Sequence, residues 1–226
     1  NYLELDFNDG VSTKLDIKNL ALEFYNDDKV IKSINKIKWD NSLTKLKNFK
    51  YHNNIFDSEE MYDLLISFYE YGFVIIKEVP NTEDFIIKFA NSIGSVRRTN
   101  FGECFNVKSK PNPNDLAYTS LALSPHTDNP YRNPVPCIQL LHCIESNVSG
   151  GLSTLVDGYT VTEDLKKERP EFYEILTNVN VKFKFIDKDV VLENWSPLIE
   201  LNADKSFKQV RFSPRLDYVP IIDKNK

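Results

Sequence analysis

The sequence predicts a mainly β protein, a β-sandwich or jelly roll with flanking helices packed outside. Three observations favour this fold class. Short runs that alternate apolar and polar residues occur near both ends of the chain, and apolar residues at helical spacing are confined to a few segments. Six prolines between residues 111 and 136 also restrict long helices in the middle. We expect a small β domain over residues 1–50 and the main domain over residues 51–226.

The first fifty residues are predicted to form short strands. Residues 3–7 alternate apolar and polar side chains and then reach Asn8-Asp9-Gly10, a strong hairpin signal. A weaker copy of this pattern follows at residues 20–28. We therefore expect two hairpins that form a plain N-terminal sheet without chemistry of its own.

Two helices separated by a strand are predicted next. The run Asp57-Ser58-Glu59-Glu60 matches a capping box, in which Asp57 would cap the first helix and Glu60 would bond back. Gly72 provides a stop for this helix, and residues 73–76 form an apolar run expected to be a buried strand. The second helix is predicted over residues 83–92 and ends at Gly94, with an inward face of Phe85, Ile86, Phe89, Ala90 and Ile93.

The rest of the chain is predicted to contain strands, loops and one interrupted helix. Periodicity and turn residues predict, in order, strands at 138–144 and 153–156, a helix over 160–178 that breaks at Pro170, a half-buried strand at 181–185 and a hairpin over 198–212. The turn of this hairpin is expected near Asn202-Ala203-Asp204.

Composition excludes several classes of partner. The net charge of −5 and the scattered lysines argue against a nucleic-acid partner. No apolar run approaches 18 residues, so no membrane partner is expected. The cysteines Cys104, Cys137 and Cys143 lack CxxC spacing and cannot all pair, which is typical of reduced thiols in a cytoplasmic protein.

His126 and Asp128 form the most informative pair in the chain. In extended backbone, residues two apart point to the same side, so this imidazole and carboxylate would converge. A neutral nitrogen and an anionic oxygen are two thirds of the facial triad that binds non-heme Fe(II). The same spacing also fits an ordinary surface turn. The position of the pair between residues 117–123, which resemble a strand, and the run at 138–144 favours a small-molecule site at a barrel mouth.

Four blocks of sequence resemble one known family. The blocks are Ala117-Tyr118-Thr119, Pro125-His126-Thr127-Asp128, Ile138 to Cys143 and Gly150 to Gly158. In order and spacing they resemble the Fe(II)/2-oxoglutarate-dependent dioxygenases of the taurine dioxygenase superfamily, in the γ-butyrobetaine and trimethyllysine hydroxylase branch. The resemblance runs from Asn53 to the C-terminus, and the N-terminal strands resemble the small domain that precedes the catalytic domain in that branch.

The resemblance implies a double-stranded β-helix (jelly roll) that binds iron through His126 and Asp128. It also implies 2-oxoglutarate as cosubstrate and O2 as oxidant, in a hydroxylation that releases succinate and CO2. Ser153 matches the position at which related enzymes hydrogen-bond the distal carboxylate of 2-oxoglutarate. A strand hydroxyl that is satisfied by the backbone is the alternative role for Ser153.

The resemblance also suggests substrate-binding residues. Enzymes of this branch hold a trimethylammonium group in an aromatic cage, and the matching positions here are Phe101, Phe105 and Tyr118. A fourth cage position falls at Asn129, which is not aromatic, and core packing is the alternative role for the two Phe residues. Asn129 and Arg132 resemble relatives that hydroxylate 2-aminoethylphosphonate or its trimethylated form, in which Arg132 would recognise an anionic end or simply be solvated. The expected substrate is a small amine or trimethylammonium zwitterion.

Some features of the family are missing from this sequence. A second iron-binding histidine and an arginine that pairs with 2-oxoglutarate are expected beyond Lys226, so we expect the natural protein to continue there. His142 is interpreted as a packed, hydrogen-bonded core residue, and His52 has no partner signal. Zinc occurs in the N-terminal domain of much of this branch. It would enter here only if residues are missing from this chain, because no cysteine precedes Cys104.

A function of a different class stays open, namely a metal-poor jelly-roll binding module without a complete triad. A histidine-bearing strand beyond the present C-terminus would favour the enzyme, and its absence would favour the binding module. A hydrolase is poorly supported, because the sequence has no G-x-S-x-G, P-loop or H-E-x-x-H motif. A homodimer is compatible with either hypothesis.

Overall fold

A computed structural model describes residues 2–17, 35–44, 46–108, 122–146, 150–187, 190–214 and 217–218. The helices in these ranges are α2 (Glu59–Tyr71), α3 (Phe85–Ile93), α4 (Gly158–Glu168) and α5 (Pro170–Asn178), with a 3-10 turn η1 (Ile55–Asp57) before α2. The strands are β1 (Tyr2–Asp6), β2 (Ser12–Asp16), β3 (Phe49–Lys50), β4 (Ile76–Lys77), β5 (Val181–Asp187), β6 (Val190–Ser196), β7 (Ile199–Leu201), β8 (Phe207–Val210) and β9 (Asp217–Tyr218).

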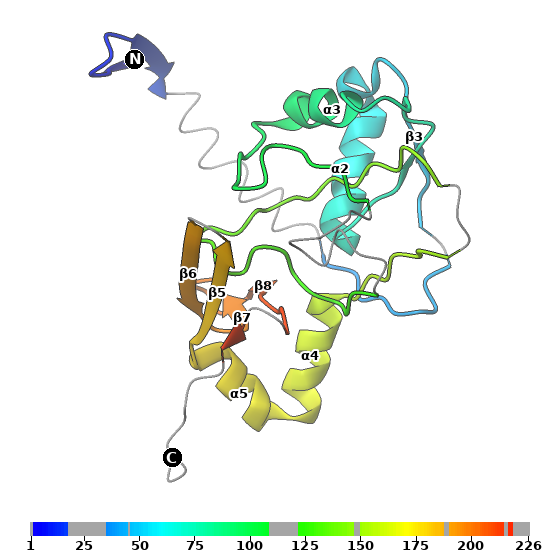
Figure 1. The fold of residues 1–226 in the computed structure, drawn as a ribbon, viewed down its shortest axis with the longest axis vertical. Coiled ribbons are helices and arrows are strands. Elements are labelled where there is room, and N and C mark those ends of the chain that lie inside the picture. Colours follow the sequence, from blue (N-terminus) through cyan, green and yellow to red (C-terminus); the bar gives the residue numbers. More distant parts are fainter. Residues whose placement is uncertain are drawn as a thin grey trace.

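The N-terminal hairpin is confirmed. Strands β1 and β2 pair antiparallel from Tyr2 opposite Asp16 to Asp6 opposite Ser12, and the turn reaches Gly10 at φ +86°. That conformation favours glycine, which explains the Asn-Asp-Gly signal. The hairpin lies at the blue end of the ribbon, apart from the other elements (Figure 1). The predicted second copy of the pattern at residues 20–28 lies outside the described residues.

The two helices that follow pack over a small apolar core. Phe49, Ile55, Met61 and Leu64 are buried together, and β3 pairs with β4 in parallel beside them. Helix α3 closes this core through Phe89, which is 6% exposed, whereas Ile93 at its end is 42% exposed. The prediction that Ile93 faces inward was wrong, because α3 ends at that residue and the chain leaves the core there.

The start of α2 differs from the predicted capping box. The N-cap is Ser58, and its hydroxyl donates to the carbonyl of Ile55 at 2.6 Å instead of capping the helix. Asp57 belongs to η1 and so lacks the extended backbone that an N-cap needs. Glu60 instead lies 3.3 Å from His52. The predicted stop is confirmed, since Gly72 is the C-cap at φ +79°.

The C-terminal part contains the best-formed sheet. Strand β5 pairs antiparallel with β6 on one side and with β9 on the other. Val181 and Phe183 alternate into its core with Tyr131, as the predicted half-buried strand requires. Helices α4 and α5 confirm the predicted helix that breaks at Pro170, the first residue of α5. Strands β7 and β8 confirm the predicted hairpin over 198–212.

Three predicted strands are not formed as expected. The run at 73–76 contributes only Ile76 to β4, and Ile75 is 50% exposed. The runs at 138–144 and 153–156 have no strand assignment, with Leu141 74% exposed. A strand is stable only where a neighbouring strand accepts its backbone hydrogen bonds, and neither run has such a neighbour among the described residues. The described strands form four small sheets of two, two, three and two strands, not a closed barrel.

The predicted domain boundary at residue 50 stays a prediction. Residues just before it contact the main part of the chain through Trp39, whose indole N–H donates to the carbonyl of Tyr71 at 2.8 Å. The Trp39 backbone N–H also approaches Asp157, the residue that caps α4. In the described ranges no helix is long and apolar enough to cross a membrane.

Candidate metal centre

The predicted convergence of His126 and Asp128 is present. Nε2 of His126 lies 3.4 Å from Oδ1 of Asp128, and the two side chains are 26% and 45% exposed. They lie in the loop over residues 122–146. This loop runs between α2 and α3 on one side and strands β5 to β8 on the other (Figure 1). Both groups are therefore close together and accessible to a ligand from solvent.

A backbone contact determines which nitrogen of His126 is free. Nδ1 lies 2.7 Å from the carbonyl oxygen of Ser124. A carbonyl oxygen can only accept a hydrogen bond. Nδ1 must therefore carry the proton, which leaves the lone pair of Nε2 directed toward Asp128 in the neutral imidazole. A backbone carbonyl on the second nitrogen is a usual arrangement for histidines that bind metals.

The carboxylate of Asp128 is held from its other side. Nε2 of Gln139 donates to Oδ2 at 2.6 Å, so Oδ1 is the oxygen that faces His126. With a neutral imidazole, Nε2 and Oδ1 are two acceptors that face each other, an arrangement that a cation between them would stabilise. Two ligands on one edge of an octahedral site, each about 2.1 Å from the ion, are roughly 3 Å apart. The donor types and their separation therefore fit two ligands of one metal ion.

A third protein ligand is not found among the described residues. They contain no group of three or more His, Cys, Asp or Glu side chains that could hold a metal. His142 packs against Phe85, with the ring centroids 5.9 Å apart. Both of its ring nitrogens are buried, and neither has a hydrogen-bond partner in the part of the chain that the structure describes, so His142 is packed as predicted but the predicted hydrogen bond is not found there. The reason is its apolar contact with α3, which offers carbon atoms to the ring.

The predicted substrate residues are only partly brought together. Phe101 and Phe105 are neighbours, with ring centroids 5.7 Å apart, and Phe105 is 44% exposed. Phe101 also meets the edge of Phe185 on β5, so it serves partly as core and partly as open surface. Tyr118 lies outside the described residues. Ser153 is exposed in a segment without regular structure, which does not match the strand hydroxyl of the alternative interpretation.

Asn129 and Arg132 both have partners inside the protein. The Oδ1 atom of Asn129 accepts a hydrogen bond from the hydroxyl of Tyr131 at 2.5 Å. Tyr131 in turn stacks on Phe185, with ring centroids 5.0 Å apart. The guanidinium of Arg132 donates to the side-chain oxygen of Asn100, so it is not simply solvated. Neither Tyr131 nor Phe185 was predicted as a site residue, although Phe185 lies in the alternation predicted at residues 181–185.

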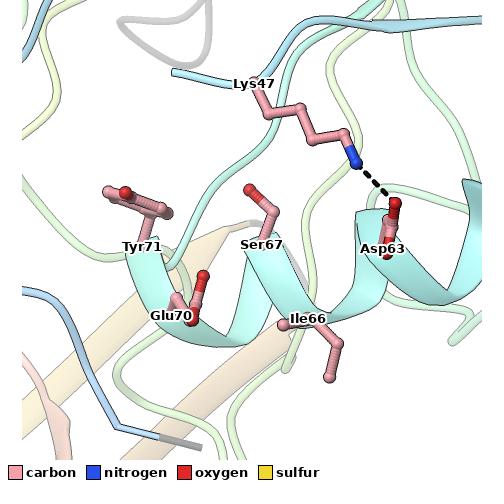
Figure 2. Close-up of a pocket in the computed structure, with 6 residues that line it drawn as sticks. All are labelled: Lys47, Asp63, Ile66, Ser67, Glu70 and Tyr71. Carbon is pink, nitrogen blue, oxygen red and sulfur yellow. Dashed lines mark hydrogen bonds and ion pairs between the residues drawn. The ribbon is translucent and has the colours of Figure 1, made fainter. Parts of the chain in front are cut away.

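A separate polar pocket lies along α2 (Figure 2). Figure 2 shows Lys47 extended over the helix, with its ammonium 2.5 Å from the carboxylate of Asp63. The lining residues are Lys47, Asp63, Ile66, Ser67, Glu70 and Tyr71. The pocket contains none of the predicted site residues.

Comparison with known proteins identifies the family. Residues 40–224 match the family described as taurine catabolism dioxygenase TauD, TfdA family. The chain belongs to this family. The TauD/TfdA match includes the His126–Asp128 loop and the elements from β3 to β9.

Individual relatives lie in the branch that the sequence resembles. The chain is 32% identical to a gamma-butyrobetaine dioxygenase of Pseudomonas sp. (strain AK-1) over 157 residues, which cover 70% of the chain and 41% of that protein. It is 31% identical to a mitochondrial trimethyllysine dioxygenase of Mus musculus over 183 residues, 79% of the chain and 43% of that protein. The gamma-butyrobetaine dioxygenase of Homo sapiens is 32% identical over 69% of the chain and 41% of its own length. The chain thus spans about two fifths of these relatives.

Proposed function

We propose that the protein is an Fe(II)- and 2-oxoglutarate-dependent dioxygenase that hydroxylates a small trimethylammonium zwitterion. The observation that carries this proposal is the convergence of two side chains of metal-ligand type, with Nε2 of His126 3.4 Å from Oδ1 of Asp128. Membership of the TauD/TfdA family and the names of the relatives support the same class of reaction. The family's jelly-roll fold, completed by residues other than those described, is part of the proposal.

The residues of this chain would act mainly by holding and orienting. His126 and Asp128 would bind the iron, and the contacts from Ser124 and Gln139 would keep their free atoms in place. When bound, iron with 2-oxoglutarate and O2 supplies the oxidation of a C–H bond to an alcohol. Ser153 would donate a hydrogen bond to the distal carboxylate of 2-oxoglutarate. Its exposed hydroxyl is accessible for that contact.

The aromatic residues support a cationic substrate group. Phe101 and Phe105 present neighbouring rings with part of their surface open, and such rings attract quaternary ammonium groups. Tyr118 would complete this wall. Asn129 contributes no ring, and its amide oxygen is already engaged by Tyr131, so it would border the group without hydrogen-bonding to it.

The proposal is tested by succinate formation in the full-length protein. With Fe(II), O2 and 2-oxoglutarate, γ-butyrobetaine or trimethyllysine should increase succinate release more than 2-aminoethylphosphonate does. His126→Ala and Asp128→Ala should each abolish the substrate-dependent increase, because each removes a metal ligand. His52→Ala is the matched control, since His52 contacts Glu60 away from the loop and should retain wild-type rates. Full activity in either ligand variant would refute the site.

A preference for 2-aminoethylphosphonate would instead change the substrate class. The anionic end of that compound would need a cation, and Arg132 is the nearest candidate in the loop. Arg132 donates to Asn100 through Nη2 alone, and its Nε has no hydrogen-bond partner among the described residues, so donors remain for an anion without exchange of that contact. The choice among substrates therefore depends on a direct comparison of the three compounds under identical iron and 2-oxoglutarate concentrations.

A further inference from the structure

The most completely bonded buried charge in the described residues is the guanidinium of Arg211, which follows β8. Arg211 is 3% exposed. Its Nη1 donates to the carbonyl oxygens of Pro130 at 3.1 Å and Arg132 at 2.8 Å. Its Nε and Nη2 both lie 3.3 Å from Oε2 of Glu200 on β7. One side chain therefore joins the β7–β8 hairpin to the loop segment that directly follows Asp128.

The next residue along the chain, Phe212, forms hydrogen bonds with the loop on the other side of Asp128. The backbone N–H of Thr127 donates to the carbonyl of Phe212 at 2.7 Å. The backbone N–H of Phe212 donates in return to the hydroxyl of Thr127 at 2.9 Å. Thr127 stands between the two predicted metal ligands, so residues 211 and 212 together hold the loop before and after Asp128.

The contacts of Arg211 and Phe212 with the loop, which we call the clamp, suit a positioning role. A guanidinium is planar and permanently charged, and it can donate to two carbonyls and a carboxylate in one fixed geometry. Glu200 supplies the compensating charge, and Lys208 and Gln209 hold the same carboxylate. Because the charge is paired and each of the three guanidinium nitrogens donates a hydrogen bond, its burial fixes the loop without leaving an isolated ion in the interior.

We infer that Arg211 is a positioning residue for the metal-binding loop, acting through the carbonyls of Pro130 and Arg132. Together with the Thr127–Phe212 pair it fixes the backbone that presents His126 and Asp128. This inference rests on the proposed function. It goes beyond that function because it assigns metal affinity to a residue that touches neither the metal ligands nor the substrate.

Metal binding, measured apart from turnover, tests this role. Mn(II) is titrated anaerobically, in the presence of 2-oxoglutarate, into the full-length wild-type, Arg211→Lys and Arg211→Met proteins. Metal binding is measured as the loss of the electron paramagnetic resonance signal of free Mn(II). Loss of a group that hydrogen-bonds a metal ligand typically weakens metal affinity by about 10- to 100-fold. Arg211 acts one step further out, through backbone carbonyls of the loop, so we expect a loss of about tenfold at most for both variants. The lysine variant should lose affinity as well, because lysine keeps the charge but cannot make the forked contacts.

Lys208→Met is the matched control. It removes a partner of the same Glu200 carboxylate but touches no part of the loop, so its Mn(II) affinity should stay within about twofold of wild type. Each variant's folded state is checked by near-ultraviolet circular dichroism before titration. Folded Arg211 variants with wild-type affinity would overturn the inference.

A second pair of variants keeps the test decisive if the Arg211 variants do not fold. Thr127→Val removes the hydroxyl that accepts from Phe212, whereas Thr127→Ser retains it. The valine variant should bind Mn(II) more weakly and the serine variant should match wild type. Equal affinity for both would overturn the clamp. If wild type itself binds no Mn(II), or if His126→Ala binds normally, the proposed function fails instead, and the two failures are thereby distinguished.

Discussion

The hydrogen bond from Gln139 to Asp128 gives a prediction whose size follows from the geometry. Nε2 of Gln139 lies 2.6 Å from Oδ2 of Asp128 and leaves Oδ1 toward His126. Gln139→Leu keeps a similar side-chain volume but removes the donor. The carboxylate should then rotate more freely, so that part of the time Oδ1 no longer faces the metal position. We expect weaker metal binding without loss of the fold.

The expected magnitude is modest because the carboxylate is half exposed. A hydrogen bond to a charged group contributes about 1.5–3 kcal/mol when it is well shielded. The side chain of Asp128 is 45% exposed, so water can replace much of the lost contact. An effect of about 1 kcal/mol on the free energy of metal binding remains, and it corresponds to a rise of about fivefold in the dissociation constant.

The assay is the anaerobic Mn(II) titration with 2-oxoglutarate in the full-length protein. Cys137→Ser is a suitable control, since Cys137 is exposed two residues away and makes only a weak sulfur contact to Val135. The control should bind Mn(II) like wild type. The reasoning would be refuted by a Gln139→Leu protein with unchanged affinity, and a hundredfold loss would show that Gln139 does far more than orient one carboxylate.

Two further predictions concern stability. Gly72→Ala should lower the free energy of unfolding by about 1 kcal/mol, because φ is +79°; the cost is no larger because no atom lies within 4 Å of the added Cβ. Gly94→Ala is the control and should cost much less, because φ is 178° there. Equal urea midpoints for the two variants would contradict this prediction. Burial raises the pKa of Glu200, but hydrogen bonds from Lys208 and Gln209 and the charges of Lys208 and Arg211 outweigh it, so this pKa is below its usual value. A lowered carboxyl pKa stabilises the fold above the unfolded value of about 4.3 and loses that contribution as the pH falls through the folded value. The melting temperature of wild type should therefore exceed that of Glu200→Gln at neutral pH and approach it in acid, and a constant difference from pH 7 to pH 3 would contradict this.

The elements that the sequence predicts well are those whose signals are local. In β5 the alternation of Val181 and Phe183 with lysines is a property of five consecutive residues, and the sheet forms as expected. The break at Pro170 is also local, because proline cannot continue a helix that precedes it but suits the first turn of the next. Hairpin β7–β8 is defined by its own turn. Each of these signals lies in neighbouring residues, although the finished β5 sheet also packs against Tyr131 and pairs with β9.

The elements that fail depend on partners elsewhere. The run at 138–144 is apolar enough for a buried strand, yet Ile138 is 53% exposed and Leu141 is 74% exposed. Apolar composition predicts burial only where another layer covers the segment, and composition carries no information about that layer. The capping box failed for a local reason instead, since the 3-10 turn just before α2 includes Asp57 and leaves Ser58 as the N-cap.

In the candidate site, too, the features with a local signal could be predicted and those that depend on distant residues could not. His126 and Asp128 could be predicted because two residues apart in extended backbone they share a side whatever surrounds them. The hydrogen bond from Gln139 to Asp128 and the stacking of Phe185 on Tyr131 could not, because both depend on how the loop folds back on itself and on β5. Arg211 is separated from Pro130 by 81 positions, and a single arginine near a strand end carries no sign of such a contact.

The difference between the local His126–Asp128 pair and its long-range contacts matters for metal binding. A His-x-Asp tripeptide determines the distance between its two donor atoms, but it does not determine where they point relative to the rest of the protein. That direction comes from backbone contacts of the loop, and here they are made by Thr127, Pro130 and Arg132 to residues 211 and 212. The same tripeptide on an unclamped surface turn would populate many orientations, and each would bind metal only while the donors converge. On the inference drawn for Arg211, a metal site here depends on the distant arginine as well as on the local pair, which is why the pair alone is a weak signal in a sequence.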